Sequence, residues 1–136
     1  MIVCDTSAWV EFLRGTGSAV DDALAGLLPT RRLLVPDVVR LELLAGAGSD
    51  ERAVDLRRLL ARYAPSPTSS PGDHDLAAGL YRQARRSGLT VRSLLDCLVA
   101  AHALRADAEL LARDRDFAVL AAISPLRLHP ATVPHR

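Results

Sequence analysis

The sequence predicts a three-layer α/β fold, in which helices flank a short parallel sheet. Brief apolar segments alternate with longer segments of helical periodicity, as in consecutive βαβ units. The chain has 136 residues, 49% of them hydrophobic, which is enough to bury one substantial core. We therefore expect one domain over residues 1–136, without an internal repeat or linker.

The expected strands are short runs rich in valine and leucine. They cover residues 1–4, 32–35, 109–112 and 126–128. The segment 64–72 is rich in proline and serine, which predicts a loop that contains at most a weak edge strand.

The expected helices are bounded by capping residues and glycines. They cover residues 6–13, 18–28, 37–45, 50–63, 73–87, 92–104 and 116–122. Thr6 or Ser7 suits the cap of the first helix and Ser18 that of the second. Pro36 suits the first position of the third helix, because proline is tolerated there. Residues 130–136 are expected to fray.

Composition indicates a compartment and excludes some partners. The net charge is only +1, so no overall field points to a nucleic-acid partner. No apolar run is long enough to span a membrane, and the N-terminus lacks the basic region of a signal peptide. Cys4 and Cys97 form no CxxC pair, which is typical of buried thiols in a reducing compartment. These features predict a cytoplasmic protein.

Two acidic residues lie in apolar helical segments that offer them no nearby cation. Asp96 has Val99 and Ala100 at the neighbouring helical positions, and Glu42 has only apolar or small neighbours. A buried unpaired carboxylate is costly, so it is normally neutralised, paired or bound to a metal. Taken alone, Asp96 is explained as well by a position near the positive end of its helix or by a distant arginine partner, and Glu42 by a solvated position on the surface.

Three further acids lie at or beyond the ends of expected strands. Asp5 follows the first strand directly, and Asp114 comes just after the strand over 109–112. Ligands of open α/β sheets bind beyond the carboxyl ends of the strands, so both side chains are expected to face a crevice. Asp116 lies two residues further on, where it suits either the same site or the cap of the short helix that follows.

Taken together, these acids predict a divalent-cation site. Carboxylates that converge in one pocket repel each other and raise one another's pKa values. A bound Mg²⁺ or Mn²⁺ removes this penalty, because hard cations prefer oxygen ligands. Such sites hydrolyse phosphodiesters by activating a water and stabilising the leaving oxygen, with one or two metal ions. The chemistry therefore points to a nuclease.

The segments around these acids resemble the PIN-domain family. The matching segments, in the order of the family, are Asp5-Thr6-Ser7-Ala8, residues 41–46 around Glu42, residues 96–101 from Asp96, and residues 113–117 around Asp114 and Asp116. The resemblance covers essentially the whole chain. In length and organisation the chain looks most like the VapC-type toxins of prokaryotic toxin–antitoxin pairs.

The resemblance implies a fold, an activity, a cofactor and partners. It implies a PIN-like fold, a Mg²⁺ or Mn²⁺ site, cleavage of RNA, a homodimer, and inhibition by a small antitoxin. The catalytic acids that it implies are Asp5, Glu42, Asp96 and Asp114. The same four residues would bind the metal together with Asp116, and the division of roles between Asp114 and Asp116 stays open. Ser7, or less favourably Thr6, would orient Asp5, although simple capping explains these hydroxyls as well.

Arginines and aromatic residues near the motifs are weaker candidates for contact with RNA. Three arginines adjoin the acidic motifs and are suited to phosphate contacts, namely Arg14, Arg92 and Arg115. Arg40 and Arg113 also lie close in sequence, and surface solvation explains any of the five. Trp9 and Phe12 are spaced to share a helix face, where packing is favoured over stacking on bases. No histidine is assigned a catalytic role.

Alternative functions fail or remain open at specific residues. A phosphoacceptor receiver domain needs a lysine, and all 17 basic residues here are arginine. A haloacid-dehalogenase phosphatase would have a second aspartate where Ser7 stands. Two alternatives remain: an RNA-processing nuclease of the same family without an antitoxin, and a non-catalytic interaction module whose acids cap helices and pair with arginine.

Overall fold

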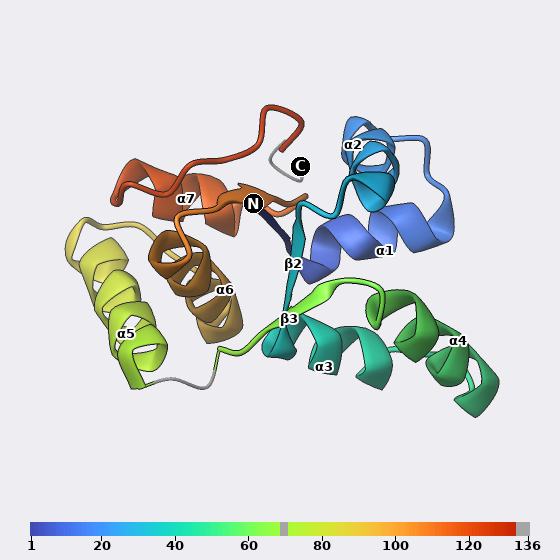
Figure 1. The fold of residues 1–136 in the computed structure, drawn as a ribbon. Helices are drawn as coiled ribbons and strands as arrows, with labels where there is room; N and C mark the ends of the chain where they lie inside the picture. Colours follow the sequence, from blue (N-terminus) through green and yellow to red (C-terminus); the bar gives the residue numbers. More distant parts are fainter. Residues whose placement is uncertain (69–70, 133–136) are drawn as a thin grey trace.

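The computed structural model describes residues 1–68 and 71–132, and its centre is a parallel sheet of short strands (Figure 1). The strands are β1 (Ile2–Cys4), β2 (Leu33–Pro36), β3 (Ala64–Ser66) and β4 (Glu109–Leu111). Their order in the sheet is β3-β2-β1-β4, and each neighbouring pair is parallel. The weak edge strand expected within 64–72 is confirmed as β3.

The strand expected over residues 126–128 is wrong. This segment forms only an isolated bridge between Leu110 and Leu128. Pro125 and Pro130 flank the segment, and proline has no N–H to extend a ladder in either direction. The fraying expected of residues 130–136 is also wrong as far as Thr132, whose Oγ1 donates to the Leu110 carbonyl at 3.0 Å. Residues 133–136 lie outside the described part of the chain.

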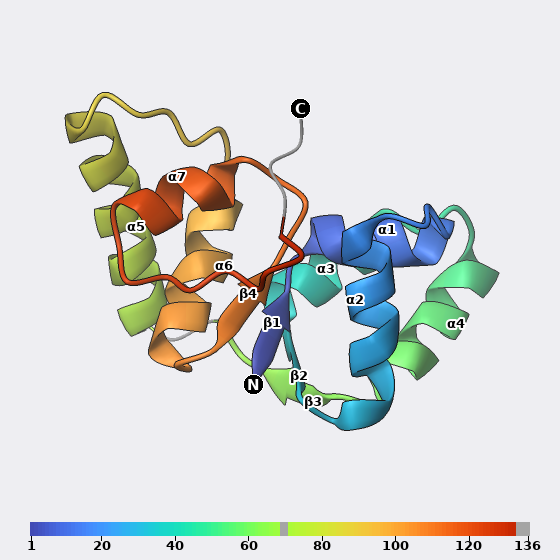
Figure 2. The ribbon, with the colours of Figure 1, turned by 90° about the horizontal axis from the view of Figure 1, so that it is seen from above.

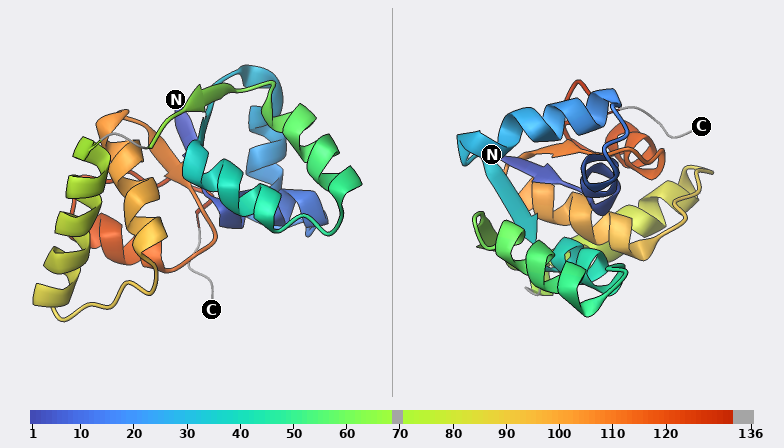
Figure 3. Two further views of the ribbon diagram at one scale, coloured as in Figure 1. Left: turned by 90° about the horizontal axis from the view of Figure 1, so that it is seen from below. Right: turned by 90° about the vertical axis from the view of Figure 1, so that its right-hand side faces the viewer.

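Helices cover both faces of the sheet, which confirms the three-layer prediction. The α-helices are α1 (Thr6–Arg14), α2 (Ala19–Leu27), α3 (Asp37–Ala45), α4 (Asp50–Leu60), α5 (Pro71–Arg86), α6 (Leu94–Arg105) and α7 (Asp116–Ala122). Helices α5, α6 and α7 lie on one side of the sheet, and α1, α2 and α4 lie on the other (Figure 2). Helix α6 lies between the sheet and α5 (Figure 3). No helix in the described ranges is long and apolar enough to cross a membrane.

Local chemistry accounts for most helix boundaries. Ser18 caps α2 as expected, and its side chain accepts from the Asp21 N–H. Ser93 caps α6, so this helix begins two residues later than the sequence pattern predicts. Helix α4 ends at Leu60 rather than at Tyr63, because the chain tightens into a turn and enters β3.

The core lies between the sheet and the helices that pack directly on it. The side chains of β1 and the inner face of α6 are buried, as the apolar pattern of residues 92–104 predicts. Trp9 is fully buried, with its ring centroid 6.3 Å from that of Phe12 and 6.2 Å from that of Tyr63. The packing interpretation of Trp9 and Phe12 is therefore the right one.

Strand order creates a topological switch point between β1 and β4. The chain adds β2 and β3 on one side of β1 and then returns to place β4 on the other side. The register pairs Cys4 with Leu111, so β1 and β4 end at the same level. In open α/β sheets the ligand crevice lies outside the strand ends at such a reversal. The residues that follow β1 and β4 therefore meet at the expected place for a site.

Candidate metal centre

Asp5 lies at the end of β1 and is held by Ser7. It is 3% exposed, and its Oδ2 accepts hydrogen bonds from the Ser7 N–H at 3.0 Å and the Ser7 hydroxyl at 2.7 Å. Asp5 is thus the cap of α1, and the expectation that Thr6 or Ser7 caps this helix is wrong. The Ser7 Oγ also accepts from the Arg113 N–H at 2.9 Å, so one hydroxyl connects the ends of β1 and β4.

Glu42 reaches the same region from α3. The Thr6 hydroxyl, at the start of α1, donates to Glu42 Oε1 at 2.8 Å. Repulsion from Glu42 contributes to the pKa shift of Asp5, which places the two carboxylates in electrostatic contact. Thr6 therefore fixes Glu42, while Ser7 fixes Asp5.

The remaining three acids form a compact cluster across the crevice. A carboxylate oxygen of Asp96, one of Asp114 and one of Asp116 lie within 4.8 Å of one another. Asp114 Oδ1 accepts from the Asp116 N–H at 2.9 Å, so Asp114, rather than Asp116, satisfies the start of α7. The capping role considered for Asp116 is therefore wrong. Asp116 is 2% exposed, whereas the side chain of Asp114 is 27% exposed and faces the crevice more openly.

Burial and mutual repulsion raise the pKa values of two acids of the site. Burial raises the pKa of Asp5 to about 6, with repulsion from Glu42 and Asp114 adding to the shift and Ser7 opposing it. Burial likewise raises the pKa of Asp96 to about 9, and its hydrogen bond with Asp116 adds to this shift. Repulsion from Asp5 and Asp114 raises the Asp96 pKa further. Asp5 therefore interacts with Glu42, Asp96 and Asp114, and Asp96 interacts with Asp5, Asp114 and Asp116, which links all five sequence-predicted acids.

The donor set suits a hard divalent cation. The side-chain ligands that converge are carboxylate oxygens, which Mg²⁺ and Mn²⁺ prefer over nitrogen or sulfur. A bound cation would also remove the repulsion that raises the pKa values of Asp5 and Asp96. Burial raises the pKa of the neighbouring Cys97 thiol to about 11, so this residue is a neutral packing group rather than a ligand.

A groove of about 530 Å³ opens beside the carboxylates, between α1 and the α3–α4 pair. Thr6 and Glu42 are among the residues that line it, so the groove is continuous with the acidic site. Arg14 and Arg52 also line it. Asp55 is a second acid in the lining, and the rest is largely apolar and includes Val10, Leu13, Leu43, Leu56 and Leu59. The groove therefore combines two guanidinium groups with an apolar surface beside Glu42.

The chain matches the PIN domain family over residues 2–123. It belongs to the PIN domain family. It is 42% identical over 129 residues to the ribonuclease VapC11 of Mycobacterium tuberculosis, a match that covers 93% of this chain and 96% of that protein. The VapC ribonuclease Mb1587 of Mycobacterium bovis matches with the same identity and coverage.

Solved structures confirm the PIN fold of the chain. The VapBC2 structure from Rickettsia felis aligns with a TM-score of 0.75 at 21% identity, covering 95% of this chain and 98% of that one. FitAcB from Neisseria gonorrhoeae aligns with a TM-score of 0.69 at 20% identity, covering 96% and 98%. At these identities the likeness establishes the fold alone.

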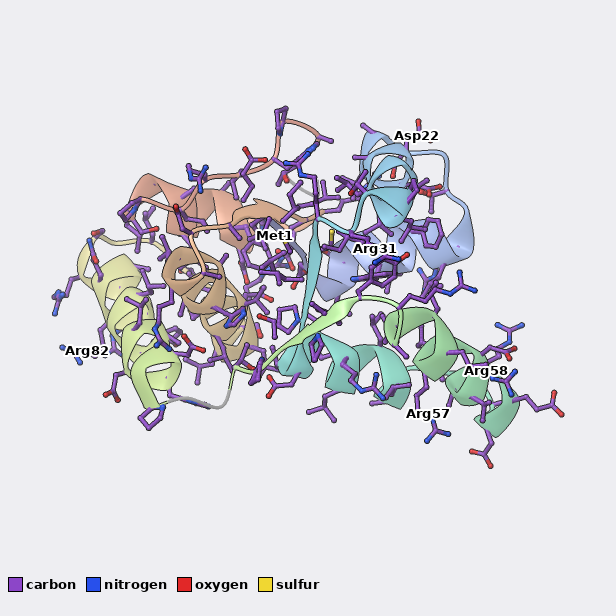
Figure 4. The ribbon with its side chains drawn as sticks, viewed as in Figure 1. Met1, Asp22, Arg31, Arg57, Arg58 and Arg82 are labelled. Atoms are coloured by element: carbon purple, nitrogen blue, oxygen red, sulfur yellow. The ribbon has the colours of Figure 1, made fainter. Side chains whose placement is uncertain are left out.

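The arginines that lie near the acidic motifs in sequence differ in their surroundings in this PIN domain. Arg92 reaches both Asp114 and Asp116, and Arg113 pairs with Glu11 at 2.7 Å. Arg115 is exposed at the start of α7, beside the cluster. Arg40 lines a separate cavity of about 290 Å³ near β3. Other arginines project outward at the margin of the molecule, as Figure 4 shows for Arg57, Arg58 and Arg82.

A second polar cluster of the PIN domain lies away from the candidate metal ligands. His102 is buried between Ser66 at the end of β3 and Asp73 of α5, with its Nδ1 3.2 Å from Asp73 Oδ2. Arg105 donates to Asp73 Oδ1 at 2.6 Å. These contacts join β3, α5 and α6, and none of them reaches the candidate metal ligands. Ser66, Asp73 and His102 are separated by many residues in the sequence and form no recognisable motif, so no sequence signal marks this cluster.

Proposed function

We propose that the protein is a Mg²⁺- or Mn²⁺-dependent endoribonuclease that acts in the cytoplasm as the toxin of a toxin–antitoxin pair. The observation that carries the proposal is the convergence of the acids that follow β1 and β4 with those of α3 and α6 at the switch point of the sheet. The relatedness to VapC ribonucleases supports RNA as the substrate. The free thiols of Cys4 and Cys97 are consistent with a reducing compartment.

In this proposal each acid has a stated task. Asp5, Glu42, Asp96 and Asp114 hold the metal, and Asp116 supports Asp96 and Asp114 from its buried position. Ser7 orients Asp5 and Thr6 orients Glu42, through the hydrogen bonds described above. A divalent cation held there would supply the positive charge that activates water and stabilises the departing 3′ oxygen, so that cleavage would leave a 5′-phosphate.

The RNA strand is proposed to follow the groove between α1 and the α3–α4 pair. Arg14 and Arg52 line this groove and are suited to contact phosphates on either side of the strand. Arg115 is exposed at the start of α7, next to Asp114 in the chain, and is proposed as a further phosphate contact. Such contacts position the strand and carry no sequence information, so the cleavage motif must come from elsewhere in the groove.

The direct test is an RNase assay on a panel of tRNA, rRNA and mRNA. We expect endonucleolytic cleavage with Mg²⁺ or Mn²⁺ and none with EDTA. Without a cation, the carboxylates repel the negatively charged phosphodiester and nothing activates the water. Restoring Mn²⁺ to the EDTA-treated protein is the control for irreversible damage. If neither RNA cleavage nor a metal-dependent change in melting temperature occurs, the chain is an interaction module instead.

The partner is proposed to be a small antitoxin that covers the acidic site, and the protein itself is proposed to be a homodimer. The antitoxin would supply an arginine to the carboxylates or an apolar helix to the adjoining groove, whose lining has both characters. Co-purification of the full chain with the product of the adjacent upstream gene tests this. A nuclease that is active but captures no such partner would be an RNA-processing enzyme of the same family.

A further inference from the structure

Arg92 places a positive charge directly on the candidate metal ligands. It lies just before α6, and its Nη2 is 3.2 Å from Asp114 Oδ1 while its Nε is 3.4 Å from Asp116 Oδ1. Among the ion pairs of the described residues, these are the two that involve an acid of the cluster; Arg113 pairs with Glu11 instead. Arg92 is therefore the internal counter-ion of the site.

The contacts of Arg92 divide into a fixed part and a loose part. Its backbone N–H donates to the buried Asp116 Oδ2 at 3.0 Å, which anchors the start of α6. Its guanidinium contacts are longer than the 2.7–2.9 Å or so of strong charge-assisted hydrogen bonds. The side chain is also 51% exposed. The guanidinium can therefore leave the acids without disturbing the backbone.

A divalent cation and this guanidinium would compete for Asp114. The Oδ1 atom of Asp114 already accepts from Arg92 and from the Asp116 N–H. A cation bound to Asp114 would lie within a few ångströms of a second positive charge, and this repulsion is strong in a partly buried site. One of the two positive groups has to move, and the exposed side chain is the one that can.

We propose that Arg92 is a displaceable counter-ion: it neutralises Asp114 and Asp116 in the metal-free protein, is released when the cation binds, and then contacts a phosphate of the RNA. This inference rests on the proposed metal-dependent nuclease. The displacement of Arg92 would couple metal binding to RNA binding. It would lower the affinity for the metal and make the guanidinium available to a phosphate only when the metal is bound. A guanidinium suits this task, because its planar fork binds phosphate with two hydrogen bonds.

Calorimetric titration of the full-length protein with Mn²⁺ tests the first half without RNA. Arg92→Gln should bind Mn²⁺ at least about tenfold more tightly than the wild type, because a competing charge is lost. Arg92→Lys keeps the charge and should stay near the wild-type affinity. Arg127→Ala is the matched control, since Arg127 pairs with the exposed Asp107 and should leave Mn²⁺ affinity unchanged. Unchanged or weaker binding by Arg92→Gln would overturn the counter-ion role.

Kinetics at saturating Mn²⁺ test the second half. Arg92→Gln should raise KM for RNA about tenfold or more although it binds the metal more tightly, and Arg92→Lys should recover part of this loss. An unchanged KM would overturn the phosphate contact. If the wild type cleaves no RNA at all, the nuclease proposal fails, whereas the Mn²⁺ titrations still decide whether Arg92 competes with the cation.

Discussion

Asp96→Asn is expected to abolish RNA cleavage, lowering kcat roughly a thousandfold or more. The substitution keeps the size of the side chain and removes the negative charge that would hold the cation. The fold should persist, because burial and repulsion disfavour the ionised form of Asp96 and raise its pKa to about 9, so a negative charge there does not stabilise the metal-free fold. The amide is uncharged at every pH, like the protonated carboxyl that it replaces at neutral pH, so the metal-free variant should unfold near the wild-type temperature at pH 7 and above it at pH 9.

The measurement is cleavage of one RNA substrate by both proteins at saturating Mn²⁺, with thermal unfolding recorded alongside. Asp107→Asn is the matched control, because Asp107 is exposed, pairs with Arg127 and lies at φ 51°, a conformation that asparagine adopts readily. It should cleave as the wild type does. Wild-type cleavage by Asp96→Asn would mean that the metal-site assignment is wrong.

The second large effect concerns how stability depends on pH and on metal. Asp5 and Asp96 have pKa values of about 6 and about 9 in the folded protein, above the 3.8 of an ordinary aspartate. Between the ordinary aspartate pKa and these raised values, the folded state binds more protons than the unfolded state. The free energy of unfolding therefore falls as pH rises through this range. Without metal, we expect the melting temperature to decrease from pH 5 through pH 9.

Mg²⁺ should reverse this trend. The cation binds the ionised carboxylates, releases their protons and stabilises the folded state by about 2.7 kcal/mol at a concentration of 100 times Kd. The gain should grow with pH, since fewer protons then have to be displaced. Thermal unfolding at pH 5, 7 and 9, with and without Mg²⁺, measures both effects. Asp96→Asn should flatten the metal-free decrease above about pH 7, where Asp5 is already ionised and no longer contributes.

Other carboxylates define the lower limit of this pH window. Despite slight burial, hydrogen bonds from Ser18 and Thr16 lower the pKa of Glu11, and those from Thr68 lower the pKa of Asp37. Their contribution to stability is present above the ordinary carboxyl pKa and is lost as pH falls below it. Acid therefore destabilises the protein for a separate reason below about pH 4. A metal-free melting temperature that rises steadily from pH 5 to pH 9 would contradict the pKa assignment.

Much of the fold was predictable, because it depends on interactions between near neighbours in the chain. Ser18 caps α2 through a hydrogen bond to Asp21, and the apolar run around Val99 predicts the buried helix α6. Two errors depend on single residues. Asp5, rather than Thr6 or Ser7, caps α1. Pro125 and Pro130 beside the segment 126–128 have no N–H with which to extend its isolated bridge into a strand.

The acids of the candidate site were also visible in the sequence, through their position at strand ends or on apolar helices. Their residue types already limited the chemistry: carboxylates without a lysine leave hard-cation catalysis and exclude phosphoacceptor mechanisms that need one. Which acids share a pocket depends on strand order, because Asp5 and Asp114 meet only when β4 pairs with β1. The same arrangement buries Asp116, leaves Asp114 partly exposed, and places the Arg92 guanidinium in contact with both carboxylates. Spacing along the chain carries no information about such contacts, since they join residues that the folding of the whole sheet brings together.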